Sequence, residues 1–277
     1  MKTIDLWNNN APYGGGSVEM HCYEPEVKKG DGAVIIFSGG GYSHRAYHEG
    51  EPYALELNRM GLLAFVVDYR VMPEHYLAPL SDAQRAVSYV RRNAAEYGIS
   101  PDKIAVMGSS AGGHLAALCA VFKNGCLHGE WLIDNTIDYW PDAQILCYPV
   151  MDFESHNGSY DNLLGDWVTI PTYPGETNTI EKWHYYMNPI AQVENDVAPP
   201  AFIWHTSSDD CVDVKGTYRY ATRLSELGAL VEMHIYPVGC HGLGLATGDP
   251  KRAPVEYVQR WIEDLERWLR LIGWINE

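Results

Sequence analysis

Short apolar runs alternate with longer amphipathic stretches along most of the chain. Six runs are rich in Val, Ile and Ala and are bounded by Gly, Pro or Asp, which favours strands over helices. They cover residues 33–37, 62–68, 104–107, 145–148, 201–205 and 231–236. Continuous apolar runs of this length are typical of strands buried on both faces. The pattern therefore predicts an α/β fold in which helices cover both faces of a mostly parallel central sheet.

Further elements are expected before and between these runs. Residues 3–7 and 17–23 are predicted to be antiparallel edge strands. Helices are predicted at residues 51–60, 81–97, 111–122, 215–227 and 253–271. A glycine follows three of them as a stop signal, at Gly61, Gly98 and Gly228. Ser81, followed by Asp82, is expected to cap the second helix.

The segment at about residues 152–200 interrupts this alternation. It has no strand pattern and is rich in Tyr, Trp, Asn, Gly and Pro. Long irregular insertions in compact folds commonly form lids or binding loops. We therefore expect a lid-like insertion after the sixth strand. Because no repeat or linker divides the chain, residues 1–277 are predicted to form a single domain.

Composition narrows the class of protein and its partners. The formal net charge is −16, which disfavours nucleic acid and anionic membranes as partners and suits a neutral or cationic small molecule. The apolar runs are far shorter than the ~18 residues of a membrane span, and the first residues lack a signal-peptide pattern. We expect a cytoplasmic protein, and the sequence leaves a homo-oligomer open.

The cysteines and histidines do not follow the spacing of metal ligands. The six cysteines include no CxxC pair, and no HExxH motif is present. Buried free thiols and no metal are therefore expected.

The sequence Gly108-Ser109-Ser110-Ala111-Gly112 matches G-x-S-x-G and lies between an apolar strand and a predicted helix. A nucleophilic serine on such a sharp turn is sterically crowded, so the residues two positions away must be small. The pattern predicts Ser110 as the nucleophile and the N–H of Ala111 as an oxyanion donor. A purely structural turn is the alternative.

Three consecutive glycines follow the strand at residues 33–37, in the sequence Ser38-Gly39-Gly40-Gly41-Tyr42. Glycine lets the backbone approach a ligand closely and aim its N–H groups at it. Gly40 and Gly41 are the expected partners of Ala111 in an oxyanion hole. A phosphate-binding loop is disfavoured, because neither GxGxxG nor GxxxxGK occurs.

His241 is the candidate base, since it lies between glycines in a loop after the last strand. In α/β-hydrolases an acid stands between the serine and the histidine in the chain. Asp209, Asp210 and Asp213 all follow the strand at residues 201–205, and spacing does not choose among them. Cys211 and Cys240 flank the acid and the base, so we expect them to lie close together as buried thiols under the site.

Longer motifs carry a family resemblance over nearly the whole chain. They are SGGGY at residues 38–42, EGEPYALEL at 49–57, DYRVMPEHYLAPLSDAQRAVSYVR at 68–91, GISPDKIAVMGSSAGGHLAA at 98–117, YYMNPI at 185–190 and PPAFIWHTSSDDCVDV at 199–214. The chain resembles α/β-hydrolase esterases of the hormone-sensitive-lipase-like and acetylxylan- and feruloyl-esterase-like groups. Their acid usually occurs as D-x-x-V, and this pattern selects Asp209. The chain departs from the common pattern in two places, with Ser38 in place of a histidine and Asp213 in place of a proline.

The resemblance implies acyl transfer through an acyl-enzyme, without a metal or organic cofactor. The expected substrate is a small-molecule ester, preferably an acetylated sugar or xylo-oligosaccharide. Tyr42, Trp183 and Tyr186 are candidate substrate contacts, because aromatic faces stack on sugar rings. The aromatic residues of the insertion could equally pack it onto the sheet. The rival functions are a general short-chain carboxylesterase, a peptidase and a non-catalytic binding module.

Overall fold

A computed structural model describes residues 2–122, 139–152, 156–165, 180–193, 198–250 and 252–276. Eight strands form one sheet in the order β1-β2-β4-β3-β5-β6-β7-β8. Their bounds are Lys2–Asp5 (β1), Glu19–Tyr23 (β2), Ala33–Phe37 (β3), Leu63–Val67 (β4), Ile104–Ser109 (β5), Ala143–Cys147 (β6), Ala201–Thr206 (β7) and Val231–Tyr236 (β8). All eight coincide with predicted strands to within a few residues, so the strand prediction is confirmed.

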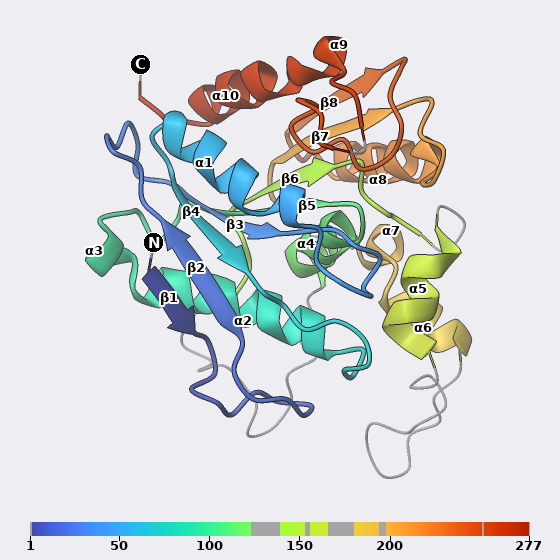
Figure 1. The fold of residues 1–277 in the computed structure, drawn as a ribbon, viewed down its shortest axis with the longest axis horizontal. Coiled ribbons are helices and arrows are strands. Elements are labelled where there is room, and N and C mark those ends of the chain that lie inside the picture. The colour runs from blue at the N-terminus through green and yellow to red at the C-terminus, as the bar shows by residue number, and fades with distance from the viewer. Residues whose placement is uncertain are drawn as a thin grey trace.

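The sheet is parallel from β4 to β8, and β2 runs antiparallel to both of its neighbours. Parallel strands have their carboxyl ends at the same edge. In Figure 1 the arrowheads of β3 and β6 point to the right, toward α5 (Asn157–Leu164) and α7 (Pro189–Gln192). Ligand sites in α/β sheets form at this edge. The residues that follow β3, β5, β7 and β8 therefore gather there.

Helices cover both faces of the sheet, as predicted. On one face lie α1 (Glu51–Arg59), α9 (Glu256–Gln259) and α10 (Trp261–Leu271), and on the other lie α2 (Ala78–Arg92), α4 (Ala111–Val121) and α8 (Val214–Glu226) (Figure 1). The shorter helices are η1 (Tyr47–Glu49), α3 (Ala94–Tyr97) and α6 (Ile180–Tyr186). None of the helices in the described ranges is long and apolar enough to cross a bilayer.

Each face of the sheet has its own hydrophobic core. Strands β3 and β4 are fully buried, with side chains alternating between the two cores. One core contains Trp204, Trp261 and Trp268, while the other collects the small residues of α4. Helix α4 is buried along its whole length, which explains its lack of a polar face.

Two predicted helix boundaries are wrong. The second helix begins at Ala78, three residues before Ser81, and its N-cap residue is Leu77. The Ser81 hydroxyl donates instead to the carbonyl of Ala78, and Asp82 forms a buried ion pair with Arg70 at 2.7 Å. Ser81 and Asp82 therefore form buried contacts and do not cap the helix.

The last predicted helix, at residues 253–271, is shorter and divided. It begins at Glu256, and Arg260 separates α9 from α10. Pro254 explains the late start, because it disfavours a helical conformation in the residue before it.

The predicted insertion at about residues 152–200 contains α5, α6 and α7 in its described parts. Asn188 caps α7 by accepting from the N–H groups of Ile190 and Ala191. Residues 153–155, 166–179 and 194–197 of the insertion lie outside the described ranges.

Candidate active site

Ser110 lies at the sharp turn between β5 and α4. Its backbone has φ +54° and ψ −120°, a conformation that non-glycine residues rarely adopt. The turn is held by its main chain: the Ser110 N–H donates to the carbonyl of Cys147, and its own carbonyl accepts from His114 and Val150. The side chain is 8% exposed. Such strain is retained where it aims a reactive group.

The two glycines of G-x-S-x-G are required by backbone contacts. A Cβ on Gly108 would lie 2.0 Å from the carbonyl oxygen of Gly112, and a Cβ on Gly112 would lie 2.0 Å from that of Phe37. Ser109 faces away from the turn and is fully buried, 2.9 Å from the Tyr53 hydroxyl. The steric interpretation of the motif therefore agrees with the geometry.

His241 bridges the serine and an aspartate. Its Nε2 lies 2.8 Å from Ser110 Oγ, and its Nδ1 lies 2.7 Å from Asp209 Oδ2. A carboxylate only accepts hydrogen bonds, so Nδ1 carries the proton and Nε2 is free to accept the one on Ser110. The imidazole is thereby prepared to act as a base toward Ser110.

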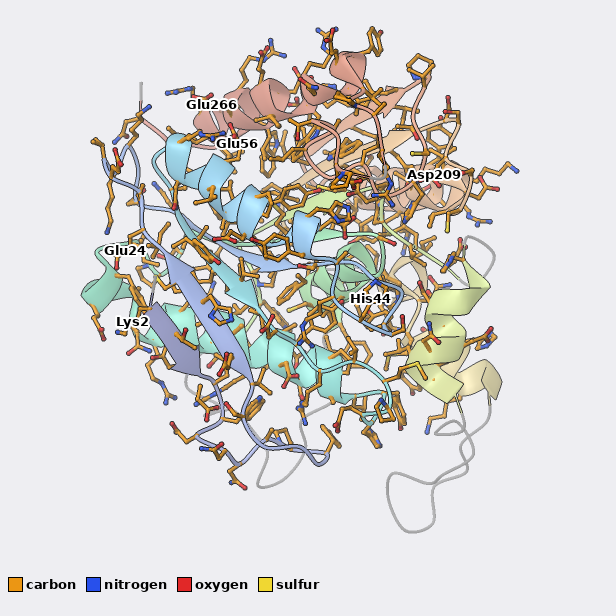
Figure 2. All side chains as sticks on the ribbon, viewed as in Figure 1. Lys2, Glu24, His44, Glu56, Asp209 and Glu266 are labelled. Carbon is orange, nitrogen blue, oxygen red and sulfur yellow. The ribbon has the colours of Figure 1, made fainter. Side chains whose placement is uncertain are left out.

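The three aspartates that the sequence left open have different partners. Asp209 accepts from the ring of His241, whereas Asp210 accepts from the backbone N–H of His241 at 3.1 Å. Asp213 caps α8 by accepting from the N–H of Lys215. Figure 2 marks Asp209 close to α8, beyond the end of β7. Only one of the three carboxylates contacts the imidazole within the described chain.

Asp209 is a buried carboxylate kept charged by its partners. Burial by itself would raise its pKa, but the hydrogen bonds from His205 and His241, the charge of His241 and the N–H of Val212 together hold the pKa well below its usual range. The carboxylate is therefore ionised throughout the neutral range and can stabilise an imidazolium on His241.

The glycine loop that carries two of the predicted oxyanion donors approaches the turn through Gly39, where an added Cβ would lie 3.0 Å from the Cβ of Ser110. Gly40 and Gly41 have φ +121° and +61°, and a Cβ on Gly40 would come within 2.2 Å of the His44 carbonyl oxygen. In the part of the chain that the structure describes, the N–H groups of Gly40, Gly41 and Ala111 have no hydrogen-bond acceptor. Unpaired N–H groups beside a nucleophile are what an oxyanion hole requires.

A buried carboxylate that the sequence analysis missed holds this loop. Glu49 is 2% exposed and accepts from the Gly39 N–H and from the Tyr148 hydroxyl, both at 2.8 Å. The Tyr148 oxygen accepts in turn from the N–H of Gly244, in the His241 loop. Glu49 and Tyr148 thus connect the glycine loop to the loop that carries the base. In sequence Glu49 is the first residue of the EGEPYALEL motif, and nothing in that motif signals its burial.

Helix α5 of the insertion borders the site. Asn162 Nδ2 donates to the carbonyl of Gly41 at 2.8 Å. The ring of His156 accepts from the N–H of Ser159 at the start of the helix. Burial and the nearby charge of His241 lower the pKa of His156. The insertion therefore contributes a side chain that contacts the glycine loop, and its role as a lid or binding loop stays a prediction.

Two of the three candidate substrate contacts, Tyr42 and Tyr186, pack against the protein interior. Tyr42 is 2% exposed, and its hydroxyl lies 2.7 Å from Nδ1 of the buried His114. Tyr186 packs against the core near Phe122. Trp183 belongs to α6, but its side chain lies outside the described residues. For Tyr42 and Tyr186 the packing interpretation fits the contacts better.

The expectation of buried thiols is wrong for the two cysteines beside the acid and the base. Cys211 and Cys240 are exposed, while Cys22, Cys119 and Cys147 are buried and form no disulfide within the described residues. Cys211 donates its N–H to Asp209, which keeps the backbone close to the acid and turns the side chain outward. Cys126 lies outside the described residues.

Three side chains outside this arrangement have metal-ligand chemistry. Glu19, His21 and Asp68 present ligand atoms within 4.8 Å of one another. Arg45 Nε lies 3.3 Å from Asp68 and supplies a positive charge there. This cluster borders a cavity of about 550 Å³ lined in part by Tyr23, His44 and Tyr47.

Comparison with known proteins identifies the family of this chain. A model of the BD-FAE family matches residues 20–224, which is well over half of the chain. The chain belongs to the BD-FAE family. Among solved structures, this BD-FAE member is similar to the acetyl ester-xyloside bifunctional hydrolase from Caldicellulosiruptor lactoaceticus, with a TM-score of 0.85 and 36% identity over 99% of this chain and 97% of that one. The predicted α/β-hydrolase fold and the family resemblance are confirmed.

Two curated relatives extend the similarity of this BD-FAE member. It is 32% identical over 254 residues to the endo-1,4-beta-xylanase B of Butyrivibrio fibrisolvens, covering 88% of this chain and 37% of that protein. It is 29% identical over 263 residues to the acetylxylan esterase of Xylanibacter ruminicola, covering 93% of this chain and 49% of that protein. The chain thus spans half or less of the length of these two relatives.

Proposed function

We propose that this protein is a serine esterase that removes acetyl groups from xylo-oligosaccharides or closely related sugars. The observation that carries the proposal is the continuous hydrogen-bonded series Ser110–His241–Asp209, together with the N–H groups of Gly40, Gly41 and Ala111, which have no acceptor among the described residues. This arrangement fits acyl transfer and requires no metal.

In the first half of the proposed reaction, Ser110 Oγ attacks the ester carbonyl carbon and gives its proton to His241 Nε2. The carbonyl oxygen becomes an oxyanion that accepts from Gly40, Gly41 and Ala111, while Asp209 stabilises the imidazolium. The bond to the sugar oxygen then breaks, and His241 returns the proton to the departing hydroxyl. An acetyl group remains on Ser110.

Water completes the cycle. It gives one proton to His241 Nε2 and attacks the acetyl carbonyl, and the second tetrahedral intermediate uses the same oxyanion donors. The bond to Ser110 Oγ breaks, His241 reprotonates the serine, and acetate leaves. Each proton that His241 takes is returned within the same half-reaction.

The sugar part of the proposal rests on the relatives and on charge. Two similar proteins are described as an acetylxylan esterase and an acetyl ester-xyloside hydrolase. A chain of net charge −16 suits a neutral saccharide better than an anionic ligand. We also propose a cytoplasmic location, because none of the five cysteines in the described part of the chain forms a disulfide, as expected in a reducing compartment. Fractionation of cells that produce the protein would test this.

The decisive experiment measures acetate release from acetylated xylo-oligosaccharides, with p-nitrophenyl acetate and a peptide anilide alongside. We expect wild type to release acetate and Ser110→Ala to lose roughly 10⁶-fold in kcat, as expected for removal of such a nucleophile. Turnover of p-nitrophenyl acetate alone would favour a general carboxylesterase, and cleavage of the anilide a peptidase. Absence of any Ser110-dependent turnover would leave a binding module.

A further inference from the structure

A second histidine contacts the acid of the proposed triad. His205 belongs to β7 and is fully buried, and its Nε2 lies 3.1 Å from Asp209 Oδ2. The same oxygen accepts from His241 Nδ1 at 2.7 Å. His205 on β7 and His241 in the loop after β8 therefore contact the same carboxylate oxygen of Asp209.

The tautomer of His205 follows from its other neighbour. Its Nδ1 lies 2.8 Å from the hydroxyl of Thr217, which is itself 1% exposed on α8. Asp209 can only accept, so Nε2 of a neutral His205 carries the proton. Nδ1 is then an acceptor, and the Thr217 hydroxyl donates to it. Thr217 thus fixes the orientation in which His205 donates to the acid.

These contacts fill the acceptor positions of Asp209. Its Oδ1 accepts from the backbone N–H groups of Cys211 and Val212, at 2.9 and 2.8 Å, and its Oδ2 accepts from the two histidines. A carboxylate that accepts four hydrogen bonds cannot rotate without breaking several of them. Of the four donors, His205 is the side chain that belongs to neither the backbone nor the proposed triad.

We propose that His205 is a positioning residue, which holds Asp209 Oδ2 in line with His241 Nδ1 and withdraws part of its negative charge. This inference rests on the proposed function and adds a fourth and a fifth member, His205 and Thr217, to the series that begins at Ser110. Outer partners that orient a functional histidine commonly change activity 10- to 100-fold when they are lost, as measured for metal-bound histidines.

The charge that His205 withdraws has a consequence for the pH dependence of activity. Without this donor, Asp209 presents more negative charge to His241 and favours the protonated imidazole. The base then takes up a proton at a higher pH, so the acid limb of the kcat/KM profile moves upward. The polar and charged groups that face His241 are Ser110, Tyr148, His156, Asp209 and Asp210, with His48 and Arg252 on the neighbouring carbonyl of Gly242.

The test compares substitutions at His205 and Thr217. His205→Leu should lower kcat about 10- to 100-fold at unchanged KM and move the acid limb upward. The amide of His205→Gln reaches the place of Nε2, so this variant should keep most of the wild-type kcat and most of the wild-type position of the acid limb. Thr217→Val should show a weaker form of the loss, and Thr217→Ser should restore it. If His205→Leu does not fold, the comparison of Thr217→Val with Thr217→Ser still tests the proposal.

Tyr220→Phe is the matched control. It removes a hydroxyl from the same helix and breaks a buried hydrogen bond to Gln144 of 2.8 Å, with no contact to Asp209. We expect it to lower stability and leave kcat and the acid limb unchanged. Equal kcat values and equal pH profiles in folded His205→Leu and His205→Gln would overturn the proposal. A loss of kcat in Tyr220→Phe equal to that in Thr217→Val would also overturn it.

Proton NMR separates this inference from the proposed function. The His241 Nδ1–H that donates to Asp209 should give a low-field signal in wild type and in His205→Gln. His205→Leu should shift or broaden it. If the wild type has no Ser110-dependent esterase activity, the proposed function fails, yet this signal still tests positioning. An identical signal in all three proteins would refute the positioning role whatever the activity.

Discussion

At the scale of single residues, two adjacent aspartates have different hydrogen-bond partners and therefore different roles. Asp209 faces the imidazole of His241, and Asp210, one residue later, accepts from the backbone of the same histidine. Hydrogen bonds from two histidines and two N–H groups keep Asp209 ionised despite its burial, whereas Asp210 holds the loop. Position, rather than residue type, therefore separates the acid from its neighbour.

Substituting these two aspartates separately tests that distinction. Asp209→Asn should lower kcat by about 10⁴-fold, since an amide favours the wrong tautomer of His241. Asp210→Asn keeps an acceptor for the His241 N–H and should stay within a few-fold of wild type. Kinetics on p-nitrophenyl acetate would measure both. A larger loss for Asp210→Asn than for Asp209→Asn would reverse the assignment of the acid.

At the scale of elements, the turn between β5 and α4 explains why the motif needs its glycines. The helix starts so close to the strand that a Cβ on Gly112 would overlap the Phe37 carbonyl oxygen of β3. The clash is with backbone, so it cannot be relieved by a rotamer change. The same closeness brings the N–H of Ala111 beside the glycine loop that follows β3.

Gly112→Ala should therefore destabilise the fold. Overpacking in a tight interior typically costs about 1–3 kcal/mol, and a backbone clash belongs at the upper end or beyond it. Gly16→Ala is the control, because nothing lies within 4 Å of the added Cβ. Urea unfolding of both variants measures the difference. A Gly112→Ala protein as stable as Gly16→Ala would show that β3 and α4 are not held this closely.

At the scale of the whole molecule, buried histidines make stability depend on pH. Burial lowers the pKa of His114 to about 4, against an ordinary value of 6.5. Burial and the charge of Arg70 also lower the pKa of His75 to about 4. Between about pH 4 and pH 6.5, His75 and His114 bind protons in the unfolded chain but not in the folded chain. Stability is therefore complete above about pH 6.5 and declines as the pH falls toward 4.

Urea unfolding at pH 4.5 and 7 measures this decline. For His114, which is fully buried, the shift corresponds to roughly 3 kcal/mol over the whole window. His114→Gln keeps a donor for the Met187 carbonyl and removes the titration. The variant should lose less stability than wild type on going from pH 7 to 4.5. An equal loss in both proteins would contradict the buried neutral state of His114.

Most secondary structure was predictable because local patterns determine it. The buried strands read as continuous apolar runs, and Gly98 ends α3 in a left-handed conformation, as a stop signal should. The start of α2 was not predictable, since Ser81 and Asp82 resemble a cap but serve buried contacts with Arg70. The single-domain organisation stays a prediction.

Local sequence, by itself, determined the strands, the nucleophile turn and the glycine loop, because sterics over a few neighbouring residues specify them. It also supplied His241 and three candidate acids. The D-x-x-V resemblance selects Asp209, and the tertiary structure places this aspartate, rather than the other two, against the His241 ring. Only the tertiary structure left Cys211 and Cys240 exposed, buried Tyr42, and brought Glu49 and His205 next to these residues. These outcomes depend on contacts between residues far apart in the chain, which follow from packing rather than from any local pattern.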